Sequence, residues 1–381
     1  MLGRGAKLKR REETQSSRAA ERSGSRFIGH LHAFRGVAIM LIVLVHIAGY
    51  SMFRIGTDPD MSDYLLIWAV FETIAHNGTV FFALISGLLY STVLAGRGWL
   101  SFFRSKVMNV ILPYVFFSLL FTAILFSGID GISLFSGNLG DFAREAFGNI
   151  LTGSASFHFW YLPVLVGLFA LTPLLAWIVA KPRGGWVIGA AMLVPLFVSR
   201  TWPDNSVQNV AVFMAPYAFG IWLGADYDSR MAKLRLLMKP LIATVIFLSI
   251  ATTVTFVLYT GPMYMADEQW DGPVNWYESI SYVQKMALAC LVLLWLKAHE
   301  GWRPRWLDLL ATYAFAIYFL HAAMRDVLFE GLLWLGVEIS AAWLHAPAIL
   351  AIWIATLALS LGVSVLVRRA FGRKSRMIIG A

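Results

Sequence analysis

Charged residues and cysteine are both scarce in this chain. Lys, Arg, Asp and Glu make up 14% of the 381 residues, and Cys290 is the one cysteine. A single cysteine excludes internal disulfides and clusters of cysteine ligands. So little charge, together with 59% hydrophobic residues and a mean hydropathy of +0.68, excludes an ordinary soluble domain and indicates a protein with many membrane spans.

The hydrophobic residues form long continuous runs rather than an alternating pattern. In lipid only helices and closed barrels satisfy their own backbone hydrogen bonds, and barrel strands alternate, so the runs favour helices. The apolar stretch Tyr64–Ala75 is too short to cross a bilayer alone, and we interpret it as an interfacial or re-entrant helix. We predict an all-α, polytopic transmembrane helix bundle of ten spans, at Ala33–Met52, Thr79–Ala95, Val107–Ser127, Phe159–Ala180, Gly185–Ser199, Gln208–Ala225, Leu241–Tyr259, Trp276–Lys297, Asp308–Met324 and Ala346–Val367.

The net charge of +9 is concentrated on one side of the predicted bundle. That side holds 25 of the 31 Lys and Arg residues, whereas the loops of the other side hold four, Arg54, Arg144, Arg200 and Arg325. Because short loops rich in Lys and Arg stay in the cytoplasm, we predict that both termini are cytoplasmic and that the charge does not serve nucleic acid binding. The predicted domains are a basic disordered tail (1–30), a transmembrane domain (31–368) and a basic cytoplasmic tail (369–381).

Two polar residues interrupt the first apolar run, HLHAFRGVAIMLIVLVHIAGY at residues 30–50. Arg35 and His46 are eleven positions apart, so on a helix they lie within about 20° of the same face and about 16 Å apart along the axis. An ionisable group inside a membrane is costly, and therefore faces a protein interior or a wet cavity. The resulting stripe is basic at its start and carries a titratable imidazole deeper in, which suits a long ligand with an anionic end and a reactive end.

His46 is a candidate general base, because an imidazole can take a proton from a hydroxyl near neutral pH. The alternatives are a histidine satisfied by a neighbouring helix and, for Arg35, an arginine that extends from a helix end to the interface. On the cytoplasmic side, Arg104 and Lys106 precede the third span and are natural partners for phosphates. An ordinary positively charged loop explains these two residues as well.

Further candidates gather where the outer ends of other spans are predicted. Aromatic and polar side chains together have the composition of a sugar-binding cavity, although anchoring at the membrane interface explains Trp and Tyr equally well. Glu72, four residues before His76, is placed to orient that histidine or to cap a wet helix. The residues expected to line an acceptor cavity are His158, Trp160, Tyr161, Tyr318, His321, Arg325 and Asp326, with Glu72 as a further member.

Small residues occur in FFALISGLLY, at residues 81–90, where two helices can approach closely. We interpret Ser86 there as a packing or donor-contact residue rather than a covalent nucleophile, because the sequence places no base beside it. No metal is expected, since no pair of histidines has helical ligand spacing with a third ligand nearby. Glycine-rich phosphate loops are absent from the sequence.

Five segments resemble, in the same order, the signatures of the membrane acyltransferase-3 family. They are RGVAIMLIVLVH (35–46), VFFALISGLLY (80–90), RSKVMNVILPY (104–114), FHFWYLPVLVGLFALTPLL (157–175) and YAFAIYFLH (313–321). The resemblance implies that Arg35 and His46 are the essential pair, with supporting positions at Ser86, Arg104, His158, Trp160 and His321. His32 stands where the family often has an acidic residue, and Asn109 where another basic residue is common.

The resemblance also implies an activity and its partners. We expect an integral O-acyltransferase of the cell (inner, cytoplasmic) membrane that moves an acyl group, expected to be acetyl, from cytosolic acetyl-CoA to a hydroxyl of a cell-surface glycan or glycolipid outside. Succinyl and longer acyl donors, and an acyl-enzyme in place of direct transfer, are alternatives. A proton-coupled lipid or glycan flippase or exporter, with histidines as a proton relay, is the alternative from another functional class.

Overall fold

The computed structural model describes residues 28–54, 62–126, 139–200, 207–265, 274–302, 304–339 and 341–380. Within these ranges the chain is helical and forms no β-sheet, which confirms the predicted all-α class. The α-helices are α2 (Gly29–Arg54), α3 (Ser62–Ala75), α4 (Thr79–Leu89), α5 (Trp99–Lys106), α6 (Leu112–Phe126), α7 (Leu139–Thr152), α8 (Tyr161–Val179), α9 (Gly184–Ala191), α10 (Val194–Phe197), α11 (Val207–Ala225), α12 (Tyr227–Leu236), α13 (Met238–Thr255), α14 (Gly261–Met265), α15 (Trp276–Ala298), α16 (Arg305–Thr312), α17 (Ala314–Trp334), α18 (Ala342–Phe371) and α19 (Ser375–Ile379).

Eight helical stretches in the described ranges are long and apolar enough to cross a membrane. A ninth candidate is the pair α16 and α17, which is bent by 85° at its break. The eight stretches are Gly29–Met52, Tyr64–Arg97, Trp99–Ile124, Tyr161–Val179, Val207–Ala225, Met238–Tyr264, Trp276–Ala298 and Trp343–Ile379. The transmembrane helix bundle is therefore confirmed, with fewer long helices than the ten spans expected.

Two segments differ from the spans expected. The span expected at Gly185–Ser199 is instead a pair of short helices, α9 and α10. Pro195 lies in the first turn of α10, a position where proline starts a helix well but cannot continue the hydrogen-bond ladder of a preceding one. The segment Tyr64–Ala75, expected to be a separate short helix, joins α4 in one apolar stretch, with a break at Asn77, whose φ is 58°.

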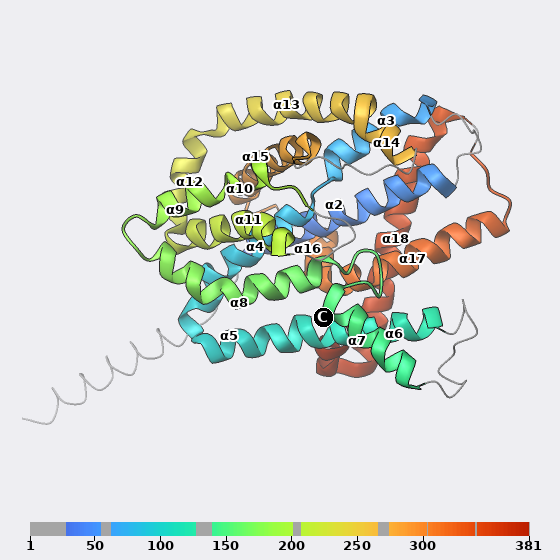
Figure 1. Ribbon diagram of the computed structural model, residues 1–381, viewed down its shortest axis with the longest axis horizontal. Helices are drawn as coiled ribbons and strands as arrows, with labels where there is room; N and C mark the ends of the chain where they lie inside the picture. Colours follow the sequence, from blue (N-terminus) through green and yellow to red (C-terminus); the bar gives the residue numbers. More distant parts are fainter. Residues whose placement is uncertain are drawn as a thin grey trace, which may run out of the picture.

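Helix α2 lies inside the bundle, as Figure 1 shows, and contacts α3, α4, α15, α16, α17 and α18. Its apolar side chains Phe34, Ile39 and Val43 have no exposed surface. Gly36 lies so close to α16 that a Cβ atom there would be 2.6 Å from Leu307 Cδ1. Its polar residues Arg35 and His46 are half-buried among these helices.

Helices α4 and α11 cross with their backbones very close together, as the small residues of the segment FFALISGLLY (81–90) predict. A Cβ atom at Gly87 would overlap the carbonyl oxygen of Tyr217, and one at Gly220 would overlap the carbonyl oxygen of Leu84. Ser86, next to Gly87, is buried on α4. The backbones of the two helices are thus in direct contact, which only glycine allows at these positions.

Of the two predicted tails, the structure describes the C-terminal one but almost none of the N-terminal one. The basic segment 1–30 lies almost entirely outside the described residues, which begin at Ile28. At the other end, α18 continues to Phe371 and the short helix α19 returns to contact α6, α17 and α18. Ile379 is 2% exposed, so this end of the chain packs against the bundle.

Replacing Gly220 by Ala should destabilise the protein by about 1–3 kcal/mol, because the added methyl group overpacks the crossing of α4 and α11. Gly362→Ala on α18 is the matched control, since nothing lies within 4 Å of its Cβ position. Alanine favours a helix over glycine by about 1 kcal/mol, so the control should be as stable as the parent protein or more stable. Thermal unfolding in detergent compares the two, and equal behaviour would contradict the close crossing.

Candidate active site

Three histidines from distant parts of the chain meet in the bundle. His46 lies on α2, His158 in the turn before α8, and His321 on α17. The rings of His46 and His321 are stacked with centroids 5.3 Å apart, and those of His158 and His321 are 4.5 Å apart, edge to face. The rings of His46 and His158 are 6.4 Å apart. We call these three residues the histidine cluster.

The hydrogen bonds of His321 fix the position of its ring proton. Nδ1 lies 2.8 Å from the carbonyl oxygen of Tyr318 and 3.2 Å from that of Ile317. A carbonyl oxygen only accepts, so Nδ1 carries the proton and Nε2 of the neutral ring has a free lone pair. Nε2 is buried without a hydrogen-bond partner in the structure. Buried polar atoms are normally paired, so an unpaired acceptor inside the cluster indicates a place for a ligand hydroxyl.

His158 is similarly held from one side. Its Nδ1 is 3.0 Å from Ser156 Oγ, its carbonyl oxygen accepts a hydrogen bond from the Tyr318 hydroxyl, and its Nε2 is buried and unpaired. Burial lowers the pKa of His158 well below its ordinary value, and the neighbouring His321 and His46 lower the pKa further. His158 is therefore neutral at neutral pH.

The exposure of the three rings differs in a way that bears on their roles. His158 is 1% exposed and His321 is fully buried, whereas His46 is half-buried. A group that takes a proton from an incoming substrate must be reachable by that substrate. His46 is the accessible member of the cluster, with the other two imidazoles packed beside it.

An arginine lies next to the histidine cluster. The Arg325 guanidinium lies over the ring of Tyr50 at 3.8 Å and over that of Phe157 at 4.6 Å, and its Nη2 is 2.7 Å from Asp326 Oδ1. Phe157 also contacts the His46 ring edge to face, at 4.9 Å. Tyr50, one turn after His46, and Phe157 were not singled out from the sequence. Their spacing from His46 and His158 is the signal that could have found them.

A second cationic centre lies near the start of α2. Arg35 is half-buried and has no carboxylate partner among the residues that the structure describes. Lys106, at the end of α5, is close enough for its charge to interact with that of Arg35, and its Nζ is 4.2 Å from the ring centroid of Phe169. Two neighbouring cations without a carboxylate between them favour an anionic ligand. Arg104 lies on the exposed side of α5 and is not brought into this centre.

The backbone changes form directly after Lys106. Residues Val107–Ile111 form a π-helical turn that joins α5 to α6. Such turns inside a helix occur frequently at functional sites, because the extra residue redirects the side chains on either side. The Asn109 amide within this turn donates to Ser105 O at 2.8 Å, so it helps to hold the turn that positions Lys106.

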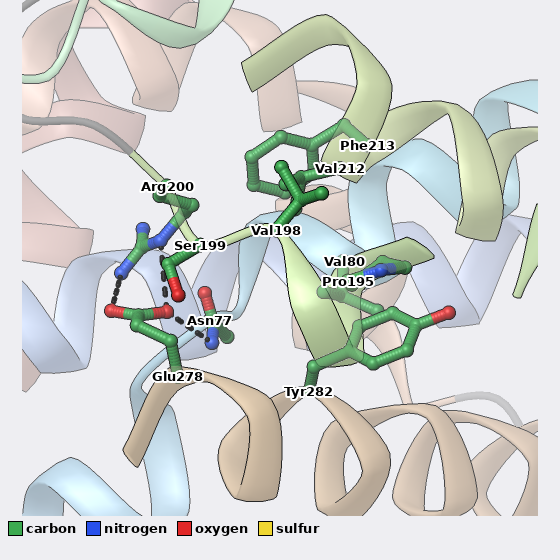
Figure 2. Close-up of a pocket in the computed structure, with 10 residues that line it drawn as sticks. All are labelled: Asn77, Val80, Pro195, Val198, Ser199, Arg200, Val212, Phe213, Glu278 and Tyr282. Carbon is green, nitrogen blue, oxygen red and sulfur yellow. Dashed lines mark hydrogen bonds and ion pairs between the residues drawn. The ribbon is translucent and has the colours of Figure 1, made fainter. Parts of the chain in front are cut away.

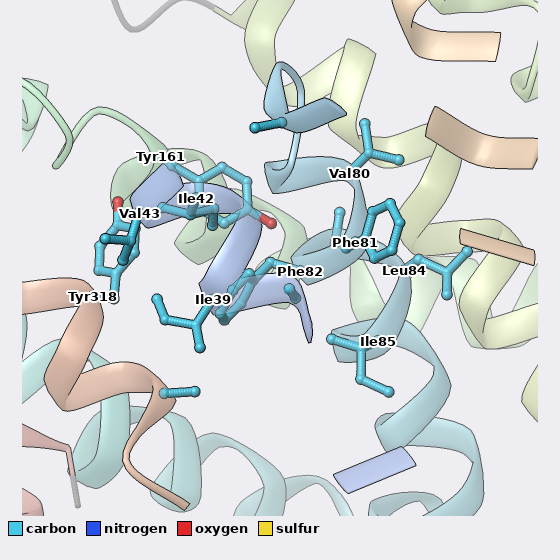
Figure 3. Close-up of a cluster of buried hydrophobic side chains, with 14 of the residues drawn as sticks. Ile39, Ile42, Val43, Val80, Phe81, Phe82, Leu84, Ile85, Tyr161 and Tyr318 are labelled. Atoms are coloured by element: carbon cyan, nitrogen blue, oxygen red, sulfur yellow. The ribbon is translucent and has the colours of Figure 1, made fainter. Parts of the chain in front are cut away.

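The remaining predicted residues divide between two places. Trp160 and Tyr161 pack on Phe213 of α11, with ring centroids 5.6 and 5.3 Å away. Tyr161 belongs to the same cluster of buried side chains as Ile42 and Val43 of α2, and Figure 3 draws all three. Among the described residues, no ring contact or hydrogen bond joins Tyr161 to the histidine cluster.

Glu72 belongs to a separate buried network. Its Oε2 is 3.0 Å from His76 Nδ1, the contact that their spacing predicts. His76 Nε2 is 3.0 Å from Glu278 Oε1, and Arg200 binds both oxygens of Glu278, at 2.6 and 3.0 Å. Glu278 and Arg200 have no local sequence signal because 78 positions separate them. The other carboxylate oxygen of Glu72, Oε1, lies 4.0 Å from the Cβ position of Gly49, three residues after His46 on α2.

Arg200, Glu278 and Asn77 face one pocket, whose other walls are mainly apolar, as Figure 2 shows. Asn77 Nδ2 donates to Glu278 Oε2 at 3.0 Å. Burial alone lowers the pKa of Arg200, but the adjacent Glu278 carboxylate holds it above its ordinary value. The ion pair therefore stays charged and ties α15 to the segment after α10, while Asn77 ties α15 to the break between α3 and α4.

The fold and the site define a polytopic membrane protein in which one internal helix connects an unpaired cationic centre to a cluster of three histidines. A family model described as an acyltransferase domain matches residues 28–369, so the chain belongs to the membrane acyltransferase-3 family. It is a membrane acyltransferase. Comparisons with curated proteins and with solved structures find no match.

Replacing Arg200 by Met should destabilise the protein by about 3 kcal/mol, because it leaves the buried Glu278 carboxylate without its guanidinium. The double variant Arg200→Met with Glu278→Gln should regain part of that loss, since no charge then remains unpaired. Thermal unfolding of the four proteins in detergent measures the coupling. A double variant less stable than Arg200→Met would contradict the view that the unpaired charge causes the loss.

Proposed function

We propose that the chain is an acyl-CoA-dependent O-acyltransferase that moves an acetyl group from cytosolic acetyl-CoA to a hydroxyl of a cell-surface glycan or glycolipid on the outer side of the cell (inner) membrane. The observation that carries the proposal is that one helix, α2, holds both Arg35 and His46. This continuous helix has Arg35 near its start, within range of the charge of Lys106, and His46 in the histidine cluster eleven residues later.

The dimensions of this arrangement suit coenzyme A. The rise of a helix separates Arg35 and His46 by about 16 Å. Acyl-CoA carries phosphates at one end and a thioester at the end of a long flexible arm, so its two ends match the two polar centres. In the proposal Arg35 and Lys106 bind the phosphates, and the thioester lies near His46.

The histidine cluster can supply the proton chemistry of acyl transfer. His46 takes the proton of the acceptor hydroxyl, whose oxygen attacks the thioester carbonyl carbon, and the thiolate of coenzyme A leaves. The proton on His46 then passes to that thiolate, so no net charge is produced. His321 and His158 remain neutral beside His46, and their unpaired Nε2 atoms can accept hydrogen bonds from acceptor hydroxyls.

Direct transfer is favoured over an acyl-enzyme by the surroundings of Ser86. That residue is buried at the close crossing of α4 and α11, and no hydrogen bond joins it to a histidine in the described part of the chain. A serine nucleophile needs a base within hydrogen-bond reach. The acyl group is therefore proposed to pass from donor to acceptor in one step.

The acceptor is proposed to reach His46 from the side of Arg325 and Asp326. Asp326 has a side chain that is 50% exposed, while its partner Arg325 is buried against Tyr50 and Phe157. Paired charges beside aromatic rings are typical of sites that bind sugars. With the distribution of Lys and Arg in the sequence, this side is assigned to the outside. Membership of an acyltransferase family gives the flippase alternative no support.

Replacing His46 by Ala should abolish transfer of label from radiolabelled acetyl-CoA to the glycan of isolated cell envelopes, a loss of at least about 100-fold. The protein should remain folded in the membrane, because His46 is only half-buried and forms no hydrogen bond that the structure records. Equal labelling by both proteins would remove His46 from the mechanism. Absence of labelling in both would count against acetyl-CoA as the donor.

Replacing Arg35 by Lys should raise KM for acetyl-CoA about tenfold with little change in kcat, because Lys keeps the charge but loses the planar fork that binds phosphate through two nitrogens. Arg183→Lys, at an exposed position before α9, is the matched control and should behave as the parent protein. Steady-state kinetics with varied acetyl-CoA measure both variants. An unchanged KM for Arg35→Lys would place the phosphates elsewhere.

A further inference from the structure

Phe157 is an exposed aromatic ring in contact with the histidine cluster. It lies in the turn between α7 and α8, outside the apolar stretches that can cross a membrane, and 37% of its surface is exposed. Its ring contacts that of His46 at 4.9 Å and that of His158 at 5.2 Å, edge to face in both cases. One exposed apolar ring is ordinary on a protein surface. This ring, however, touches two members of the proposed site, so a molecule that covers it lies beside His46.

The Arg325 guanidinium contacts the same ring. Its Cζ is 4.6 Å from the centroid of Phe157 and 3.8 Å from that of Tyr50, which follows His46 by one helical turn. Because His46 and Arg325 both touch the Phe157 ring, at most one ring and its two contacts separate them. A single small group that lies on Phe157 can therefore reach the imidazole and the guanidinium together.

The ion pair of Arg325 and Asp326 leaves one donor group and one acceptor oxygen open. Arg325 Nε and Nη2 both donate to the same oxygen, Asp326 Oδ1, at 2.9 and 2.7 Å. Within the described part of the chain, no hydrogen bond involves Arg325 Nη1 or Asp326 Oδ2. The Asp326 side chain is 50% exposed, so a ligand can reach it from outside the bundle. The pair thus presents N–H groups and a carboxylate oxygen side by side.

Two neighbouring hydroxyls match this pair better than an anion does. A hydroxyl both donates and accepts, so one hydroxyl can accept from the guanidinium while the next donates to the carboxylate. A carboxylate ligand only accepts, and it would meet the negative charge of Asp326 beside the arginine. The apolar C–H face of a sugar ring also packs well on an aromatic ring, which Phe157 supplies. A neutral sugar therefore satisfies the exposed ring and both open polar groups.

We propose that one neutral sugar unit of the acceptor lies on the Phe157 ring and that two of its neighbouring hydroxyls bind the pair of Arg325 and Asp326. A third hydroxyl is then directed at His46. The inference rests on the proposed function and names the class of acceptor: a glycan or glycolipid whose acylated sugar carries a free vicinal diol and no acidic group beside it. The diol keeps its protons during transfer, so these residues position the acceptor and His46 takes the one proton that moves.

Replacing Asp326 by Asn tests the diol, because the direction of the change depends on the ligand. Asn keeps the shape and an oxygen for Arg325, but it turns the open acceptor into an NH2 donor. With label from radiolabelled acetyl-CoA as the readout, KM for isolated envelope glycan should rise about tenfold, and kcat and KM for acetyl-CoA should change less than about threefold. An acidic group bound at Arg325 predicts a lower KM for glycan, since a repelling charge is removed. A lower or unchanged KM would overturn the proposal.

Asp141→Asn is the matched control. Asp141 is also a partly exposed carboxylate, 40% at the side chain, that pairs with an arginine, Arg144, at 3.3 Å. It lies in the first turn of α7, and its partner is 84% exposed. The control should keep the KM of the parent protein for glycan. If the two Asn variants raise this KM equally, the effect does not come from the pair at Phe157, and the proposal fails.

Two substitutions of Phe157 test the place of the sugar ring. Phe157→Leu keeps an apolar side chain but removes the aromatic face, so KM for glycan should rise about fivefold, whereas Phe157→Tyr keeps the ring and should behave as the parent protein. A ring that only supports His46 predicts a lower kcat with an unchanged KM in the Leu variant. That result would overturn the proposed position of the sugar.

Periodate separates this proposal from the proposed function, because it cleaves the bond between two carbons that carry neighbouring hydroxyls. Envelope glycan treated with periodate and then borohydride should lose most of its capacity to accept label from the parent protein. Glycan treated with borohydride alone is the control and should keep that capacity. Undiminished labelling after complete oxidation would overturn the diol and leave the acyltransferase proposal in place. Absence of labelling of untreated glycan would overturn the proposed function, and this inference with it.

Discussion

The structure depends on a polar stripe being carried into the membrane on one helix. Arg35 and His46 are tolerated on α2 because that helix contacts six others, and both residues are half-buried among them. The helices around α2 also determine the chemistry that is open to the Arg35 guanidinium and the His46 imidazole. An arginine without a carboxylate binds an anion, and an imidazole among other neutral imidazoles accepts a proton. The remainder of the bundle serves to bring Lys106, His158 and His321 to the two ends of this stripe.

Much of this arrangement could be predicted from the sequence, because polar residues inside apolar runs are conspicuous. The predicted positions of the spans were enough to group three histidines: His46 in the first apolar run, and His158 and His321 at the ends of later spans. The ion pair of Arg200 and Glu278 could not be predicted, since nothing local marks two residues 78 positions apart as neighbours. The sequence therefore paired Glu72 with His76 but did not reveal the rest of the network to which both belong. Hydropathy also predicted one membrane span at Gly185–Ser199. The structure has two short helices there, because the chain turns before Pro195.

The network around Glu278 and the histidine cluster are both buried groups of polar side chains, but they differ in how fully their hydrogen bonds are satisfied. In the network of Glu72, His76, Glu278 and Arg200, every side chain has partners, and the charges largely offset each other. In the histidine cluster, by contrast, two ring nitrogens are buried and unpaired. Fully paired networks fix a structure, whereas groups with unused hydrogen-bonding capacity are ready to bind another molecule. This contrast is the physical reason for proposing the histidine cluster, and not the paired network, as the reaction site.

The close crossing of α4 and α11 has a consequence for how a substrate could pass the bilayer. Backbones in contact at Gly87 and Gly220 can neither slide nor separate by a small amount without losing their packing. A transporter that moves two halves of its bundle around a central binding site would have to break the contact between α4 and α11 in every cycle. The close crossing instead suits the proposed direct transfer, in which the helices keep their places and only the small acyl group passes from the donor on one side of the membrane to the acceptor on the other.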